Sequence, residues 1–208
     1  VIGLGWMGML YDVRPGEGRI ADRFEIDDVD RPTPELDPTR KFYYHNMHLL
    51  KGWTPTTYAE SLWDRPEVDL VAGAERDPKR LKVYQERYGV DALYTDAAEM
   101  FRNEKLDIVA IATNTKDRAD LTCLAVENGV KAVMTDKPMA HTLEESDRMV
   151  KTCAEAGVPL LCGATTTNHP SFATARDLIG SGTIGEVVSM DVADVLAQHQ
   201  NWSYFLDS

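Results

Sequence analysis

Short apolar runs alternate with amphipathic segments along most of this 208-residue chain, and no other feature of the sequence restricts its fold as strongly. The apolar runs have the length of buried strands, and the amphipathic segments have the length of helices that cover a sheet. This alternation predicts βαβ units and an α/β fold, with a doubly wound parallel sheet covered on both faces. We expect strands at about 68–74, 107–113, 131–135 and 159–163, and helices at about 78–88, 116–128 and 142–157.

Capping residues mark where helices should begin and end. Asp77 followed by Pro78 is typical of an N-cap and a first helical residue, and Gly89 is typical of the position just beyond a helix. Asp96 stands three residues before Glu99, which is the spacing of a capping box and predicts a further short helix.

The chain opens with VIGLGWMG, in which the glycines have the spacing G-x-G-x-x-G. In a strand–turn–helix unit, Gly3 allows the tight turn, Gly5 lets the backbone approach a diphosphate, and Gly8 lets the helix pack closely. Backbone N–H groups and the positive end of the helix dipole would hold the phosphate charge. We therefore expect Trp6 and Met7 to bind a dinucleotide together with these glycines, in a Rossmann fold.

Four polar or glycine-rich loops follow the expected strands, at residues 3–8, 75–76, 113–115 and 136–138. Right-handed crossovers place the C-terminal ends of parallel strands at one edge of the sheet, where ligands bind. The loops should therefore meet there.

Glu75 ends the second strand, where an acid can accept hydrogen bonds from the adenosine ribose hydroxyls. It stands much further from the glycines than the usual separation of about 20 residues, so its position at a strand end carries the assignment. The alternative is a solvated carboxylate at a helix start. Arg76 could stack on adenine or pair with a 2′-phosphate, so both NAD and NADP remain open.

Lys137 follows a buried strand at the same edge and is our candidate for catalysis. Its ammonium could hydrogen-bond a substrate hydroxyl and share a proton as hydride leaves. The residues alone leave open the alternative of an ordinary surface lysine.

The overall charge and apolar content exclude several classes of function. The formal net charge is −12, and Lys and Arg are scattered, which argues against a nucleic-acid surface. No apolar run approaches the roughly 20 residues of a membrane span. Three cysteines without a close pair, Cys123, Cys153 and Cys162, indicate reduced, buried thiols in a cytoplasmic protein.

Two regions depart from the alternation. Residues 12–57 form a polar, proline-rich insertion, which we expect to be a surface excursion; a lid or an oligomer contact is the alternative. From about residue 166 to 208 we expect the start of a second, α+β domain, with a helix at Pro170–Ile179 and a strand at Glu186–Val192. Because only Val1 and Ile2 precede the first glycine, we expect the chain to be part of a longer protein.

Several motifs in one order resemble the Gfo/Idh/MocA family of NAD(P)-dependent oxidoreductases. They are Val1–Gly8, Ala74–Pro78, Ile111–Thr115, Thr135–Pro138, Asn168–Pro170 and Gly182–Val187. The resemblance implies hydride transfer between nicotinamide and a hydroxyl carbon of a sugar, inositol or related polyol. It places Lys137 at the reacting carbon and Asp136, Thr113, Asn114 and Thr115 around the cofactor. It also implies a homo-oligomer formed through the second domain.

The sequence departs from this family at several positions. Asp136 replaces a usual Glu, Asn114 a frequent Pro, and Arg118 a common His. The family's catalytic Asp-x-x-x-His motif is not found; His199 is the candidate nearest to it, and His169 could face the substrate. Both are more often ordinary loop residues. The alternatives to a dehydrogenase are a relative that uses NAD without net redox, as a lyase or glycosidase, and a non-catalytic dinucleotide-binding protein.

Overall fold

The computed structural model describes residues 1–10, 13–14, 18–19, 57–63, 65–163 and 170–191 of the chain. Most of the predicted insertion at 12–57, and the candidates His169 and His199, lie outside these residues. The helical elements are η1 (Trp6–Leu10, a π-helix), α3 (Tyr58–Trp63), α4 (Pro78–Tyr88), α5 (Ala97–Asn103), α6 (Thr115–Glu127), α7 (Leu143–Ala156) and α8 (Pro170–Gly180). The strands are β1 (Val13–Arg14), β2 (Gly18–Arg19), β3 (Ala72–Ala74), β4 (Ala92–Tyr94), β5 (Ile108–Ile111), β6 (Ala132–Thr135) and β7 (Leu160–Cys162).

The parallel strands are joined through the opening segment of the chain. β3 pairs with β4, and β5, β6 and β7 pair in that order, all parallel. Ile2 forms parallel bridges both to Ala74 of β3 and to Ile111 of β5. The spatial order is therefore β4, β3, the Ile2 segment, β5, β6, β7, and the order reverses at Ile2. In doubly wound sheets, ligands bind at such a reversal.

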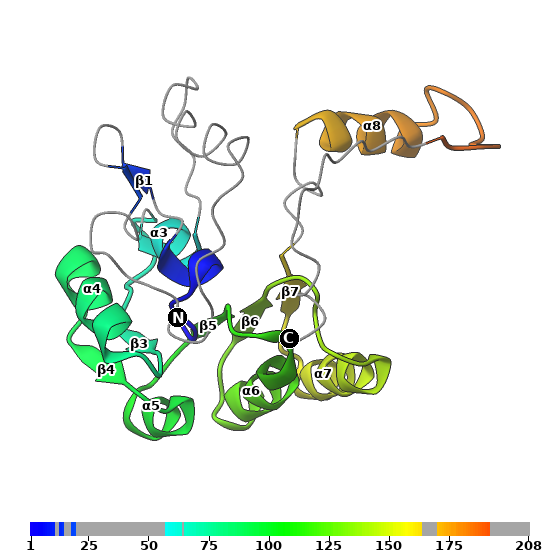
Figure 1. Ribbon diagram of the computed structural model, residues 1–208. Helices are drawn as coiled ribbons and strands as arrows, with labels where there is room; N and C mark the ends of the chain where they lie inside the picture. The colour runs from blue at the N-terminus through cyan, green and yellow to red at the C-terminus, as the bar shows by residue number, and fades with distance from the viewer. Residues whose placement is uncertain (11–12, 15–17, 20–56, 64, 164–169, 192–208) are drawn as a thin grey trace, which may run out of the picture.

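Helices cover both faces of this sheet, as the sequence predicted. Figure 1 shows α6 and α7 side by side next to β6 and β7, with α4 and α5 near β3 and β4. Neighbouring residues of the opening strand point to opposite faces, because side chains alternate along a strand. Val1 belongs to one apolar cluster and Ile2 to the other.

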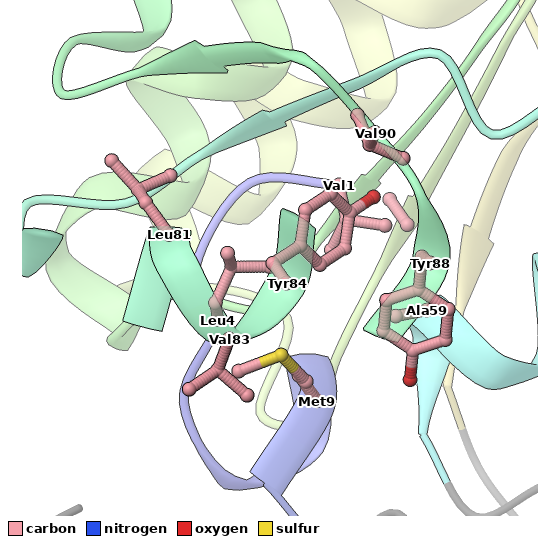
Figure 2. Close-up of a cluster of buried hydrophobic side chains, with 10 residues drawn as sticks. Val1, Leu4, Met9, Ala59, Leu81, Val83, Tyr84, Tyr88 and Val90 are labelled. Atoms are coloured by element: carbon pink, nitrogen blue, oxygen red, sulfur yellow. The ribbon is translucent and has the colours of Figure 1, made fainter. Parts of the chain in front are cut away.

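The first cluster packs α4 against the opening segment. Figure 2 shows Val1, Leu4 and Met9 gathered around Tyr84 of α4, and all four are buried. Burying a large apolar side chain contributes about 1.5–3 kcal/mol. The second cluster contains Ile2, Met100, Phe101, Val109, Ile111, Ala125 and Val133, among others. The position of the glycine turn is therefore fixed by core packing on both sides.

The capping predictions are confirmed. The Asp77 side chain accepts a hydrogen bond from the N–H of Lys79 at 2.8 Å, and Gly89, whose φ is +69°, is the C-cap directly after α4. The Asp96 side chain accepts from the N–H of Glu99 at 2.8 Å, one of the two bonds of a capping box.

Three expectations need correction. β4 was not predicted, because its three residues are only partly buried and are not part of a longer apolar run. The strand expected at Glu186–Val192 is wrong over its described part, since residues 186–191 are exposed and pair with no strand among the described residues. The three cysteines are free, but Cys153 alone of them is buried, whereas Cys123 is half-buried and Cys162 is exposed. Cys162 is exposed because β7 has no neighbour beyond it in the described sheet.

Other boundaries differ by a few residues. The strand expected at 68–74 is regular only over β3, and Val71 before it is 46% exposed. α8 and the turn after it have the predicted positions, and Figure 1 shows α8 standing apart from the sheet. The domain boundary near residue 165 stays a prediction. Within the described residues, none of the helices has both the length and the apolar character that a bilayer crossing requires.

Candidate dinucleotide-binding site

A cleft of about 1180 Å³ lies at the C-terminal edge of the parallel sheet. It is larger than the roughly 300–1,000 Å³ of pockets for drug-sized ligands. All four predicted loops contribute to its wall. The predicted site residues that line it are Gly3, Gly5, Met7, Glu75, Arg76, Thr113, Asn114, Thr115, Asp136 and Lys137. The side chain of Trp6 is not among those described, and Gly8 is buried and is not one of the lining residues.

The three glycines of the opening turn have different surroundings. Gly3 has a φ of +82°, and a Cβ there would lie 2.8 Å from the backbone nitrogen of Thr113. A Cβ on Gly8 would collide with the carbonyl oxygen of Gly3. At Gly5, by contrast, the nearest atom of the described residues to an added Cβ is Nη1 of Arg80 at 3.9 Å. Gly3 and Gly8 are therefore required by the turn itself, whereas Gly5 keeps space open on the cleft side.

Glu75 is held against this turn. Its Oε2 accepts a hydrogen bond from the N–H of Leu4 at 2.7 Å, and its Oε1 accepts from the N–H of Asp77 at 3.2 Å. Nη1 of Arg80 lies 3.7 Å from Oε2, and the Glu75 side chain is 11% exposed. The carboxylate is thus fixed and charge-balanced, and it retains acceptor capacity for ligand hydroxyls. This arrangement differs from the solvated helix-start carboxylate that was the alternative interpretation.

Arg76 lies at the mouth of the cleft. Its Nη2 is 3.7 Å from Oδ2 of Asp117 on α6, and the two side chains are 80% and 50% exposed. An ion pair this exposed contributes about 0–1 kcal/mol. The Arg76 side chain can therefore exchange Asp117 for a ligand at little cost.

Arg118 forms hydrogen bonds with two of the cleft loops. Its Nε and Nη2 donate to the carbonyl oxygen of Thr113 at 3.0 and 2.7 Å. Its Nη1 donates to the carbonyl oxygen of Asp136 at 2.8 Å and also to that of Pro138. Burial lowers the pKa of the Arg118 guanidinium, and the nearby Asp136 carboxylate opposes this. An arginine nevertheless stays protonated in proteins.

The Asp136 carboxylate lies between Arg118 and Tyr58 and is nearly buried. Its Oδ2 is 3.9 Å from Nη2 of Arg118, and its Oδ1 accepts from the Tyr58 hydroxyl at 3.4 Å. Tyr58, on α3, also donates to the carbonyl oxygen of Thr135 at 3.1 Å. Burial, followed by the charge of Asp136, raises the pKa of the Tyr58 hydroxyl. The carboxylate predicted to contact cofactor is therefore already engaged by internal partners.

Lys137 follows Asp136 and is exposed on the cleft wall, and its peptide bond to Pro138 is cis. No hydrogen bond or ion pair to its ammonium is formed by the described residues. The structure thus brings Lys137 to the same cleft as the glycine turn and Glu75, as predicted. It leaves the ammonium available to a ligand.

Arg118 and Tyr58 were not predicted as site residues. Arg118 was noted only as a departure from a family pattern, and on a helix of mixed polarity it resembles any solvated arginine. Tyr58 follows the polar insertion, where no periodic pattern indicates an orientation. The partners of both include backbone carbonyls of distant loops, which leave no signal in the side-chain sequence.

These features, a doubly wound parallel sheet with a glycine turn and an acid at its topological reversal, define a Rossmann domain that binds a dinucleotide. The family of Gfo/Idh/MocA oxidoreductases, described as having an NAD-binding Rossmann fold, matches residues 51–164, more than half of the chain. The chain belongs to this family, and the predicted resemblance, fold class and NAD cofactor of the family are confirmed.

Relatives of known activity support this assignment over part of their length. A D-apiose dehydrogenase of Paraburkholderia graminis is 36% identical over 134 residues, covering 64% of this chain and 36% of the relative. A myo-inositol 2-dehydrogenase of Thermotoga maritima is 28% identical over 135 residues, covering 65% and 40%. The crystal structure of an Agrobacterium radiobacter oxidoreductase with NAD⁺, L-tartaric acid and magnesium aligns with a TM-score of 0.56 at 31% identity, covering 60% of this chain and 36% of that one. The chain therefore spans little more than a third of the length of these proteins.

Proposed function

We propose that this chain is the cofactor-binding part of an NAD-dependent oxidoreductase that acts on a hydroxyl-bearing carbon of a sugar, inositol or related polyol. The observation that carries the proposal is the convergence of the glycine turn, Glu75 and Lys137 on one cleft. The activities of the D-apiose and inositol dehydrogenases similar to this chain support the substrate class.

The cofactor would lie along the cleft from Glu75 to Lys137. Its diphosphate would rest where Gly5 leaves space, and its adenosine ribose would donate hydrogen bonds to Glu75. A 2′-phosphate would place further negative charge beside this carboxylate, so we propose a preference for NAD over NADP. Thr113, Asn114 and Thr115 would line the cofactor between these two ends. Asp136, whose carboxylate contacts Arg118 and Tyr58, would form the cleft wall beside Lys137.

Lys137 would act on the substrate rather than on the cofactor. NAD supplies the hydride acceptor when it is bound. The Lys137 ammonium would hydrogen-bond the hydroxyl oxygen of the substrate, hold the reacting carbon towards the ring, and stabilise the oxygen as it loses its proton. As the C–H bond breaks with its electron pair, the alcohol becomes a carbonyl, and the proton leaves to a base.

The base and the subunit contacts would come from the second domain, which we place from residue 166 onwards. His169 and His199 remain candidates for the substrate side, outside the described residues. A homo-oligomer formed through that domain and a cytoplasmic location also remain predictions.

Substitution of Lys137 in the complete protein tests the proposal. We would measure NADH formation from NAD⁺ with D-apiose, myo-inositol and scyllo-inositol, and NADH affinity by fluorescence titration. Lys137→Ala should bind NADH within about 3-fold of wild type but lose at least about 100-fold in kcat, the usual size of a proton-transfer contribution. Lys131→Ala is the matched control. Lys131 directly precedes β6, at the end of that strand away from Lys137, and it is exposed and paired with Asp107.

Wild-type turnover by Lys137→Ala would refute the assignment. Turnover of substrate without accumulation of NADH would instead indicate transient use of the cofactor, as in a lyase or glycosidase. Tight NADH binding with no turnover of any polyol by the wild-type protein would favour a non-catalytic binding role.

A further inference from the structure

The main-chain carbonyls on both sides of Lys137 are held by one buried side chain. Nη1 of Arg118 donates to the carbonyl oxygen of Asp136, directly before Lys137, and to that of Pro138, directly after it. The Arg118 side chain is only 6% exposed, whereas Lys137 itself is exposed. The backbone of the lysine is thus fixed while its ammonium stays accessible in the cleft.

The same guanidinium ties this loop to the loop that follows the neighbouring strand, β5. Nε and Nη2 of Arg118 both donate to the carbonyl oxygen of Thr113, which follows β5. Thr113 and Lys137 both line the cleft, but they follow different strands. Arg118 therefore fixes the position of the Lys137 loop relative to the loop expected to contact the cofactor.

This geometry requires an arginine. Three carbonyls are contacted at once by a planar group that has five N–H donors in a fixed arrangement. A lysine ammonium is a compact point charge and cannot span the same three acceptors. The guanidinium charge is balanced by Asp136, whose other oxygen is held by Tyr58. The negative charge of Asp136 thus favours a cation at position 118, but only an arginine can reach all three carbonyl oxygens.

We propose that Arg118 is a positioning residue for Lys137: it holds the loop at residues 136–138 against the Thr113 loop, and so sets where the lysine ammonium meets the substrate. The inference rests on the proposed catalytic role of Lys137. A displacement of about 1 Å in a catalytic group can reduce a rate by about 100-fold.

Arg118→Lys tests this inference in the complete protein, because it keeps the buried positive charge beside Asp136 but cannot donate to all three carbonyl oxygens at once. We expect kcat with the best substrate among D-apiose, myo-inositol and scyllo-inositol to fall at least about 10-fold, with KM for that substrate changed less than about 3-fold. Arg102→Lys is the matched control, because Arg102 is exposed on α5 and does not line the cleft. A wild-type kcat in Arg118→Lys would overturn the inference.

A double-mutant cycle with Lys137→Ala separates positioning from general stability. If Arg118 acts through Lys137, Arg118→Lys should reduce the residual rate of Lys137→Ala by less than about 2-fold, since the group to be positioned is already absent. A purely structural role would lower the rate by the same factor in both backgrounds, and that additive result would contradict the inference.

Hydrogen exchange gives a readout that is independent of activity. In Arg118→Lys, amides at 113–117 and 136–141 should exchange at least about 10-fold faster, with those of α7 beyond residue 146 unchanged. Exchange that is faster throughout the protein, or exchange rates that do not change at all, would contradict local positioning. Tyr58→Phe is the second variant. It removes a single hydroxyl, on α3, that donates to Thr135 and Asp136, and it should give a smaller local increase.

The two proposals fail in distinguishable ways. Full turnover by Lys137→Ala would refute the catalytic role of the lysine, and the positioning inference would fall with it, even if exchange showed that Arg118 holds the loop. Loss of turnover in Lys137→Ala, together with a wild-type kcat in Arg118→Lys, would refute the positioning inference alone.

Discussion

The N–H of Leu4, inside the glycine turn, donates a hydrogen bond of 2.7 Å to Oε2 of Glu75 at the end of β3. The insertion separates these residues widely in sequence, but the pairing of Ile2 with Ala74 brings their strands together. The acid expected to bind ribose and the turn expected to bind diphosphate therefore form one unit. This link explains why Glu75 lies beside the glycine turn although the insertion at 12–57 separates the two in sequence.

Glu75→Gln should change the choice of cofactor more than the fold. The substitution keeps the side-chain length and the oxygen that can accept from Leu4, but it removes the charge and the acceptor of the longer bond from Asp77. Hydrogen bonds to a charged acceptor are worth about 1.5–3 kcal/mol against about 0.5–1.5 for neutral ones. We expect NADH to bind about 10-fold more weakly, with NADPH unchanged or tighter. Calorimetric titration of both nucleotides measures this ratio.

Arg76→Ala is the companion variant in those titrations. If Arg76 only stacks on adenine, both nucleotides should lose affinity equally; if it pairs with a 2′-phosphate, NADPH alone should. A Glu75→Gln variant that weakens both nucleotides by the same factor would contradict the proposed contact between Glu75 and the ribose.

Thr142→Ala should lower stability without affecting cofactor binding. The Thr142 hydroxyl accepts from the N–H of Glu145 at 3.2 Å, and Oε2 of Glu145 accepts from the N–H of Thr142 at 3.1 Å, which completes a capping box at the start of α7. Loss of such a cap costs about 0.5–2 kcal/mol. Urea unfolding should show this loss, with NADH affinity unchanged. A matching loss of affinity would mean that the start of α7 belongs to the site.

Tyr84 should make the protein less stable in alkali. Burial raises the pKa of its hydroxyl, which donates to the carbonyl oxygen of Ala72 at 3.3 Å. Above about pH 10, the unfolded tyrosine loses a proton that the folded one keeps, so the free energy of unfolding falls as pH rises. Below that pH the contribution is fully present. Compared with Tyr84→Phe, the wild type should lose up to about 1.4 kcal/mol more per pH unit. Parallel curves for the two proteins would contradict this.

Local signals explain most of what the sequence predicted correctly. Asp77 and Gly89 mark the two ends of α4 because capping is decided by neighbouring residues. The apolar runs identify β5 and β6 because these strands are buried in the middle of a sheet. The convergence of Glu75 and Lys137 followed from topology, since parallel strands present their C-terminal ends together.

Features that depend on distant partners were not predictable in the same way. A strand expected from alternation at Glu186–Val192 needs a neighbour, and the described residues provide none for 186–191. The role of Arg118 depends on main-chain carbonyls of two other loops, and any residue type supplies a carbonyl. The exposure of Cys162 depends on which strand lies at the edge of the sheet.

Substitutions at the three glycines of the opening turn distinguish effects on stability from effects on cofactor binding. Gly3→Ala would place a side chain at a φ of +82°, and Gly8→Ala would collide with the carbonyl of Gly3, so both should destabilise the protein by about 1–3 kcal/mol. Gly5→Ala should not, because among the described residues the nearest atom to its added methyl group is Nη1 of Arg80, 3.9 Å away. Its methyl group would instead enter the space proposed for the diphosphate.

Titration of NADH into the Gly5→Ala protein is therefore the most direct test of a nucleotide lying against this turn. We expect the unfolding temperature to stay within about 2 °C of wild type, equivalent to less than about 1 kcal/mol. NADH affinity should fall at least about 10-fold, or about 1.4 kcal/mol. NADH binding as tight as in the wild type, by a variant equally stable, would contradict the account.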